Sequence, residues 1–420
     1  MTGARQRMTG VAAFAAVLVF FFYATCKFRF AQLISFDGDA SIIFQMSASI
    51  AEAGRYIAQT SLGNFSQIFL YPPPSIVIFA TLARLGESAF IVLWVISMFA
   101  ALCASVRLCV GSEREAIRRL WPVLLLLAIL LVFNPVVYDL SNKNDNLIIL
   151  AITMTSFATL KARPVVSGLA LALAISLKLY SGVLLLWMIF FDRRAAISCI
   201  IALVALWGVM PALYFGSSGL IEIYRSWFDQ VAIANGTWLY PALKGITGPS
   251  GPPLIPLRLA LSTITGADAN SAETRSLLIL AQFTWFACLA FYAYRAWWPG
   301  QTGERPRSIL ADWSVLLLAP LPFSPWLEVY HAVALMVPCV VCLLAASDQS
   351  LGKPVRVAAV GACIGIVAVV KAPAPFEIRG LIYLVQFMVM AGALSFVRPA
   401  FIEDGGPLRV QQMAIDPIGP

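Results

Sequence analysis

Long apolar runs constrain this chain more than any other feature of its sequence. With their flanks, these runs approach the roughly 20 residues that a helix needs to cross a bilayer. Backbone groups inside lipid must be hydrogen-bonded within their own segment, so the runs predict helices rather than strands. The runs are Val11–Tyr23, Ser88–Val106, Trp121–Val137, Ala195–Tyr214, Leu277–Tyr292, Val329–Ala346, Val357–Val370 and Leu381–Val397.

The amount and the placement of charge agree with a membrane protein. Only 12% of the residues are charged and 60% are hydrophobic, whereas soluble domains carry about 25% charged residues. The net charge is +8, and its basic residues cluster in short loops such as Arg114–Arg119, Lys161–Arg163 and Lys353–Arg356. This is the positive-inside pattern of cytoplasmic loops. It indicates a lipid bilayer as the partner and argues against nucleic acid.

The runs and loops together predict an all-α polytopic membrane protein with roughly 11 to 13 membrane helices. We expect one transmembrane domain over residues 1–400, with external loops at 34–70 and 217–275, and a disordered cytoplasmic tail at 401–420. The first run is followed directly by basic residues, so we interpret it as a retained helix rather than a cleaved signal. Tyr71–Val110 and Pro164–Phe191 each need a broken or re-entrant helix, and such backbone lines cavities.

Two carboxylates, Asp37 and Asp39, stand where the chain first leaves the membrane. The following residues, Ala40–Arg55, predict a helix along the membrane surface that stops at Gly54. Asp39 is a candidate general base, but an aspartate here also suits the cap of the helix. Tyr71 then precedes three prolines, which favour the first turn of a helix.

A second group of polar residues lies ahead of the predicted helix Asn146–Leu160. The group consists of Asp139, Asn142, Lys143, Asn144, Asp145 and Asn146. A solvated end of an external loop is the simple interpretation of this group. Lys178 is harder to explain in that way, because it lies within an apolar stretch where an ammonium is costly unless it is paired or exposed to a cavity. It is a candidate contact for a lipid phosphate, with snorkelling to the interface as the alternative.

His331 is the single histidine of the chain, so a zinc site of several histidines is excluded. A lone histidine is more often a structural hydrogen-bonding group than a catalyst, but its imidazole could donate to a phosphate or shuttle a proton. The sequence has no Walker-type glycine loop and no G-x-G-x-x-G motif before a helix. We therefore expect neither a nucleotide nor a metal cofactor.

Several of these segments occur together in one known family. They are Asp39-Ala-Ser-Ile-Ile-Phe, Tyr71-Pro72-Pro73, Asn144-Asp-Asn146-Leu, Ser167-Gly-Leu-Ala, Leu177-Lys178-Leu179-Tyr180 and Ser324-Pro325-Trp326 with His331 beyond it. In this order they resemble glycosyltransferase family 87, a group of the GT-C superfamily that uses polyprenyl-phosphate sugars. The family usually has a proline after the Lys-x-Tyr segment, where this chain has Ser181.

The resemblance implies a GT-C helical bundle in the bacterial inner membrane, with its active site on the periplasmic face. It implies Asp39 as the catalytic base and His331 as a second catalytic residue. Lys178, and less directly Arg225 and Arg258, would bind the donor phosphate. Further residues would line the site: Asp37, Tyr71, Asn144, Asn146, Tyr180 and Trp326.

The implied substrates are a polyprenyl-phosphate sugar, with mannose or arabinose typical, and a glycolipid or glycan acceptor of the cell envelope. The alternative is a transporter or flippase of a lipid-linked or anionic substrate. A transporter predicts essential polar residues at both faces of the membrane. Here the candidate residues gather on the predicted external side, which favours an enzyme.

Overall fold

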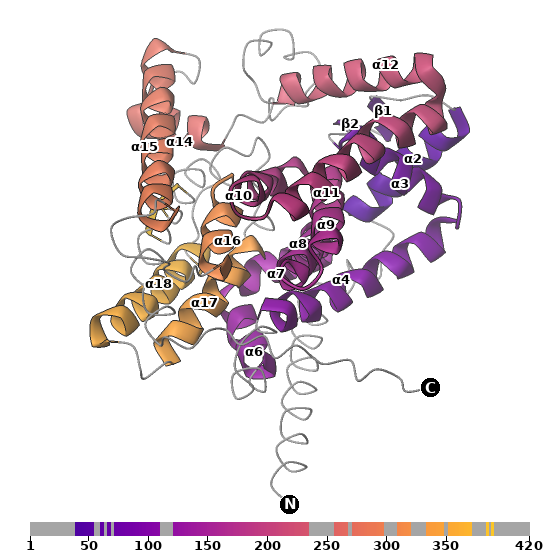
Figure 1. Ribbon diagram of the computed structural model, residues 1–420. Helices are drawn as coiled ribbons and strands as arrows, with labels where there is room; N and C mark the ends of the chain where they lie inside the picture. Colours follow the sequence, from indigo (N-terminus) through magenta and orange to yellow (C-terminus); the bar gives the residue numbers. More distant parts are fainter. Residues whose placement is uncertain are drawn as a thin grey trace, which may run out of the picture.

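The computed structural model is shown in Figure 1. It describes residues 38–53, 59–62, 65–68, 71–109, 121–234, 256–267, 271–297, 309–320, 333–347, 352–371, 384–385 and 388–389. Its helices are α2 (Asp39–Ala53), α3 (Pro73–Ala83), α4 (Glu87–Cys109), α6 (Trp121–Leu131), α7 (Phe133–Asn142), α8 (Asn146–Thr159), α9 (Pro164–Leu177), α10 (Val183–Phe191), α11 (Arg193–Val204), α12 (Met210–Ala234), α14 (Pro256–Thr265), α15 (Ala272–Trp297), α16 (Ile309–Leu318), α17 (Met336–Ser347) and α18 (Lys353–Lys371). The described chain also contains a 3₁₀ turn, η1 (Leu179–Gly182), and a π-helical turn, η2 (Ala205–Val209).

The fold confirms an all-α polytopic membrane protein. Within the described residues, three apolar helices are long enough to cross a bilayer: Glu87–Cys109, Arg193–Phe228 and Ala272–Tyr294. A fourth span is possible if α6 and α7, which meet at 88°, cross together. The other apolar helices have 10–17 residues. In the described part of the chain, most of the 11 to 13 expected membrane spans therefore do not form single long helices. The expected first helix lies outside it.

The segment 34–70, predicted to be external, contains the expected helix and one unexpected element. α2 spans Asp39–Ala53, and the predicted stop at Gly54 lies outside the described residues. After it, β1 (Gln59–Leu62) and β2 (Phe65–Ile68) pair in an antiparallel hairpin. Nothing in the sequence analysis indicated these strands.

The two segments that needed a break both have one. Residues 71–109 form α3 and α4, joined by a turn at Gly86, and α3 starts on the prolines after Tyr71 as predicted. Residues 164–191 form α9 and α10, and the helix breaks at Lys178, whose backbone is extended (φ −146°, ψ 128°). The helix in this apolar stretch is therefore interrupted at the one charged residue of the stretch.

Two expected segments differ from the structure. The run Trp121–Val137 is bent sharply into α6 and α7, because the ring of Pro135 conflicts with helical backbone at Leu131, where α6 ends. The segment 217–275, predicted to be an external loop, is largely helical where it is described: α12 continues to Ala234 after a kink at Gly216, and α14 and α15 follow. Its predicted irregular part, 248–253, lies outside the described residues.

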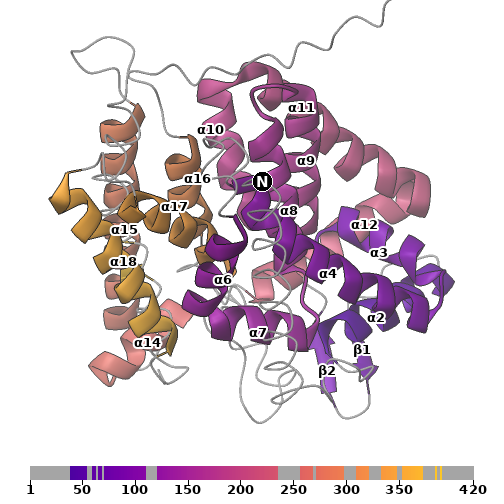
Figure 2. The same cartoon turned by 90° about the horizontal axis from the view of Figure 1, so that it is seen from below.

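The centre of the molecule is a set of closely packed helices, α4, α8, α9 and α11 (Figure 2). Small residues bring them together. Ser156 of α8 and Ser167 of α9 each donate a hydrogen bond to the other's carbonyl oxygen, at 2.8 and 2.7 Å. A Cβ at Gly168 would lie 2.4 Å from the carbonyl oxygen of Ala195 in α11, so only glycine permits this approach.

Candidate active site

Asp39 is held at the start of α2 by a close contact between two backbones. The preceding residue, Gly38, has φ +100°, and a Cβ there would lie 2.7 Å from the carbonyl oxygen of Asn142 at the end of α7. Glycine is therefore the residue that both the backbone angle and the available space require. This contact brings the Asp39 carboxylate to the turn between α7 and α8.

That turn is built on Lys143, which adopts the left-handed conformation (φ 53°, ψ 42°) at the end of α7. Such an angle is uncommon outside glycine and needs support from its surroundings. The backbone N–H of Asn144 donates to the carbonyl oxygen of Asp139 at 3.0 Å. The indole of Trp94, in α4, donates to the carbonyl oxygen of Lys143 at 2.8 Å. The turn is thus fixed from within and from α4.

The turn presents Asn144 to the candidate base. The Asn144 side-chain Nδ2 donates a hydrogen bond to Oδ2 of Asp39, and Oδ1 of Asp39 accepts no hydrogen bond from the described residues. Burial raises the pKa of Asp39 above its ordinary value, opposed by the Asn144 hydrogen bond and the charge of Lys178. The carboxylate is therefore a stronger base than one in water, and it is partly exposed.

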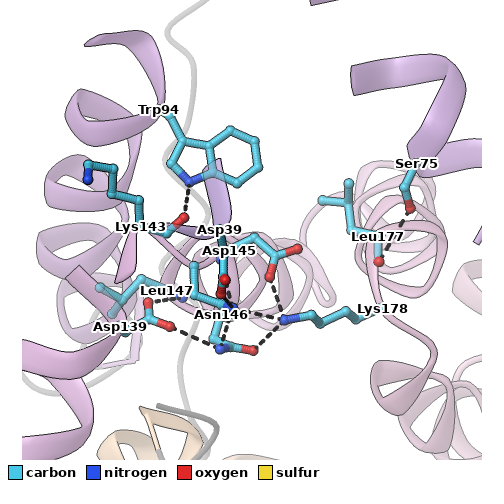
Figure 3. A network of polar contacts seen from close by, with 11 residues as sticks. Asp39, Ser75, Trp94, Asp139, Lys143, Asp145, Asn146, Leu147, Leu177 and Lys178 are labelled. Carbon is cyan, nitrogen blue, oxygen red and sulfur yellow. Dashed lines mark hydrogen bonds and ion pairs between the residues drawn. The ribbon is translucent and has the colours of Figure 1, made fainter. Parts of the chain in front are cut away.

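Lys178 meets this turn from the break between α9 and α10 (Figure 3). Its ammonium contacts Oδ1 of Asp145 at 2.5 Å, Oδ1 of Asn144 at 3.0 Å and Oδ1 of Asn146 at 2.9 Å. An ammonium has three donors and no acceptor, so Lys178 turns both carboxamide oxygens toward itself. Nδ2 of Asn144 then donates to Asp39, and Nδ2 of Asn146 donates both to Asp139 and to Oδ1 of Asn144.

On the other side, Asn146 connects Lys178 to Asp139. Nδ2 of Asn146 donates to Oδ1 of Asp139 at 2.9 Å, and the backbone N–H of Leu147 donates to Oδ2 at 3.2 Å. Asp139 thereby caps α8 from the preceding helix. Asp145 occupies the N-cap position itself, yet its side chain caps nothing. A continuous network runs from Asp39 through Asn144, Lys178 and Asn146 to Asp139.

The turn is buried, which corrects one expectation from the sequence. Its polar residues are at most 4% exposed: Asp139, Asn144, Asp145 and Asn146. The interpretation of this group as the solvated end of a loop is therefore wrong. These polar groups need partners inside the protein, and they find them in Lys178 and in one another. Lys178 pairs with Asp145 and keeps 19% of its side chain exposed, so it remains in reach of a ligand.

A second connection leads from Lys178 toward α3 and η2. The Lys178 ammonium lies 5.9 Å from the ring centre of Tyr71, a cation–π contact. Two residues earlier in α9, the carbonyl of Ser176 accepts a hydrogen bond from Ser75 at 2.5 Å. The Ser176 hydroxyl accepts one from the Trp207 indole of η2 at 3.0 Å. α3, α9 and η2 are therefore tied together next to the lysine.

An apolar groove lies beside α3 and η2. It has a volume of about 430 Å³ and lies between α3, η2 and the start of α12. The residues that line it are Val77, Ala205, Leu206, Val209, Met210, Leu213 and Tyr214. The groove is open along one side, and its walls are almost wholly apolar.

The remaining predicted site residues are distributed differently. Tyr180, in η1, packs against the core close to Lys178. Arg225 is exposed on α12 and makes no hydrogen bond or ion pair with the Lys178 network in the described structure. Arg258 belongs to α14, which lies beside α15 and far from α2 in both views (Figures 1 and 2). Three more residues lie outside the described ranges: Asp37, Trp326 and His331.

Sequence reasoning missed some members of the site. Asp139 and Asp145 were seen as polar neighbours and not assigned a role, and Trp94 and Gly38 received none. Asp145 stands between the two asparagines of the Asn-Asp-Asn segment, so its position pointed to the site. The role of Trp94 could not be predicted, because one tryptophan in an apolar helix gives no indication in the sequence that its indole donates a hydrogen bond.

A polytopic helical fold with carboxylates, carboxamides and a lysine joined at a helix break defines a candidate membrane enzyme. The model of glycosyltransferase family 87 matches residues 69–325, more than half of the 420 residues. The chain belongs to glycosyltransferase family 87 and is a membrane glycosyltransferase. No curated protein and no solved structure matches it significantly. The family match covers Lys178 and the turn at Asn144, but starts after Asp39 and ends before His331.

Proposed function

We propose that the protein transfers a sugar from a polyprenyl-phosphate donor to an acceptor hydroxyl on the periplasmic face of a bacterial inner membrane, with Asp39 as general base. The acceptor is a glycolipid or glycan of the cell envelope. The observation that carries this proposal is the connection of Asp39 through Asn144 to Lys178. It joins a base for the acceptor and a cation for the leaving phosphate in one network.

The proposed reaction uses the residues at the two ends of this connection, Asp39 and Lys178. Oδ1 of Asp39 takes the proton of the acceptor hydroxyl while the hydroxyl oxygen attacks the anomeric carbon. The bond from that carbon to the phosphate oxygen breaks, and its electron pair leaves with the polyprenyl phosphate. Lys178 stabilises the charge that develops on this phosphate. His331 is proposed as a second contact to the phosphate, with Arg225 and Arg258 as weaker candidates.

A phosphate ester is already an activated leaving group, so the proposed reaction uses no metal and no nucleotide. The donor's isoprenoid chain is proposed to lie in the apolar groove beside Val77 and Val209. Two observations support this assignment: the groove has apolar walls and an open side, and Ser176 joins its wall to the helix that ends at Lys178. A lipid chain there would leave its phosphate close to the lysine.

The test is purified protein in lipid nanodiscs, offered a panel of polyprenyl-phosphate sugars with envelope lipids and glycans as acceptors. Release of polyprenyl phosphate is measured for the wild type, for Asp39→Asn and for Glu52→Gln, which changes an exposed acid on the same helix. We expect release with one sugar, a loss of about 10²- to 10⁴-fold in Asp39→Asn and no loss in Glu52→Gln. Full activity of Asp39→Asn would show that Asp39 is not the general base. No release from any donor, together with movement of lipid-linked sugars across the bilayer, would indicate a transporter instead.

A further inference from the structure

We infer that Asp145 is a further residue of the donor-phosphate subsite, and that it acts as an internal competitor of the phosphate for Lys178. Asp145 holds the Lys178 ammonium while the subsite is empty. The donor phosphate takes its place, and the ion pair forms again when the polyprenyl phosphate leaves. This inference rests on the proposed role of Lys178 as the phosphate contact.

The bonding of Asp145 sets it apart from the other two carboxylates of the site. Asp39 accepts a hydrogen bond from Asn144, and Asp139 accepts two, from Asn146 and Leu147. Neither side-chain oxygen of Asp145 accepts a hydrogen bond from the described residues, although both are buried. The carboxylate is held by its ion pair with Lys178 at 2.5 Å. Among these three acids, it is the one held by an ion pair alone, with no hydrogen bond to its carboxylate in the described structure.

The local structure explains why Asp145 is available for this pair. An aspartate at an N-cap position normally accepts a hydrogen bond from the first turn of its own helix. At α8, Asp139 accepts from the N–H of Leu147 instead, and Asp145 makes no cap bond. Asp145 can therefore leave Lys178, or return to it, without loosening the start of the helix.

The contacts of Lys178 indicate which partner a phosphate would replace. All three of its donors are occupied, so an incoming phosphate must displace one acceptor. The two asparagine oxygens are neutral, and their bonds to Lys178 orient the amides of the network. Asp145 carries the negative charge that a phosphate would supply in its place. An unpaired buried ammonium is unfavourable, so Lys178 needs this counter-ion whenever the donor is absent.

Exposure indicates that the exchange can take place from outside the protein. The Lys178 side chain is 19% exposed, whereas that of Asp145 is 2% exposed. A phosphate can thus approach the Lys178 side chain more readily than that of Asp145. Once displaced, the Asp145 carboxylate remains close and repels the phosphate. Asp145 therefore lowers the affinity of the site for the donor and for the polyprenyl phosphate that leaves.

The experiment measures inhibition of sugar transfer by added decaprenyl phosphate in nanodiscs. Asp145→Asn keeps the shape of the side chain and removes its charge, so we expect decaprenyl phosphate to inhibit at least about tenfold more strongly. The donor KM should fall in parallel, and kcat should fall as product release slows. Asp145→Ser is the second variant, because serine can cap α8 directly and so supports folding. Glu222→Gln, at an exposed acid on α12, controls for the loss of one negative charge.

Inhibition that is unchanged or weaker in both Asp145 variants would overturn the inference. Lys178→Met separates this failure from a failure of the proposed function. If Lys178→Met weakens inhibition by decaprenyl phosphate and the Asp145 variants do not strengthen it, Lys178 binds the phosphate without competition from Asp145. If Lys178→Met leaves inhibition unchanged, the phosphate contact itself is wrong, and the role of Asp145 falls with it. If the wild type releases no polyprenyl phosphate from any donor, the proposed function is wrong.

Discussion

The side-chain amide of Asn144 donates a hydrogen bond to the carboxylate of Asp39, across 105 positions of the sequence. The same Asn144 side chain accepts a hydrogen bond from Lys178 at 3.0 Å. Because lysine is only a donor, this contact fixes which end of the amide faces Asp39. One carboxamide therefore couples the proposed base to the proposed phosphate contact, and its removal should affect both.

The first prediction concerns the pH dependence of sugar transfer. Asp39 acts as a base only when ionised, so activity should fall as the pH is lowered through its pKa. Burial raises this pKa above its ordinary value and the Asn144 hydrogen bond lowers it. Asn144→Ala removes the lowering contribution, so the acid limb of the kcat/KM profile should move to higher pH. The measurement is the pH profile of polyprenyl phosphate release.

Asn142→Ala is the matched control for this prediction. Asn142 lies in the same turn, but its side chain makes no hydrogen bond to Asp39 in the described structure. Its acid limb should coincide with that of the wild type. Equal profiles for Asn144→Ala and the wild type would mean that the amide does not set the ionisation of the base.

The second prediction concerns Gly38, the residue before the base. In Gly38→Ala the new Cβ would lie 2.7 Å from the carbonyl of Asn142, at a φ of +100°. α2 and α7 must then move apart, which we expect to cost about 1–3 kcal/mol and to reduce turnover by displacing Asp39. Gly361→Ala is the control, since a Cβ there meets no atom within 4 Å. Thermal unfolding and release of polyprenyl phosphate check both variants, and a fully active Gly38→Ala would show that this contact does not position the base.

The sequence predicted the segments of this site better than their contacts. Helix α2, the prolines that start α3 and the break within 164–191 all followed from the sequence: a helical apolar pattern, the φ of proline and the need of that segment for a broken or re-entrant helix. The sharp bend at Val132 did not, because Pro135 near the end of an apolar run also fits a straight span. The β1–β2 hairpin, in a short polar stretch, gave no alternating pattern long enough to notice.

The polar turn shows why the contacts themselves could not be predicted. Asparagine and aspartate residues before a helix are typical of a solvated loop, and local sequence does not say whether tertiary structure covers them. Here α2 and α4 cover the turn through Gly38 and Trp94, which lie more than 40 residues away in sequence. Burial then forces each polar group to find a partner. The pairing of Lys178 with Asp145 is one result, and it depends on the fold as a whole.

The third prediction separates the stability role of Asp139 from its role in the network. Asp139→Ala removes the acceptor for Asn146 and for the N–H of Leu147, which should cost about 1–3 kcal/mol. It should also lower kcat, because the Asn146 amide loses one of the two acceptors that orient it toward Lys178. Asp192→Ala is the matched control: Asp192 caps α11 through the N–H of Ala195 at 3.0 Å and is not part of the network.

Both variants should unfold at lower temperature than the wild type, and only Asp139→Ala should also lose turnover at a temperature where the protein is folded. Unfolding in nanodiscs and initial rates of polyprenyl phosphate release measure the two effects. Equal rates for the two variants would assign Asp139 to the stability of α8 alone.

The last prediction tests the groove as the binding place of the isoprenoid chain. Val209 lines the groove and is 54% exposed, so the larger side chain of Val209→Trp would fill part of it without disturbing the core. We expect the KM for a long-chain donor to rise several-fold, while a donor with a short prenyl chain, which does not reach the groove, keeps its KM. Ile201→Trp is the control, because Ile201 is 65% exposed on the neighbouring α11 and does not line the groove. Competition between long- and short-chain donors measures the difference directly. If Val209→Trp raised the KM of both donors equally, the chain would lie elsewhere and the effect would come from the altered helix.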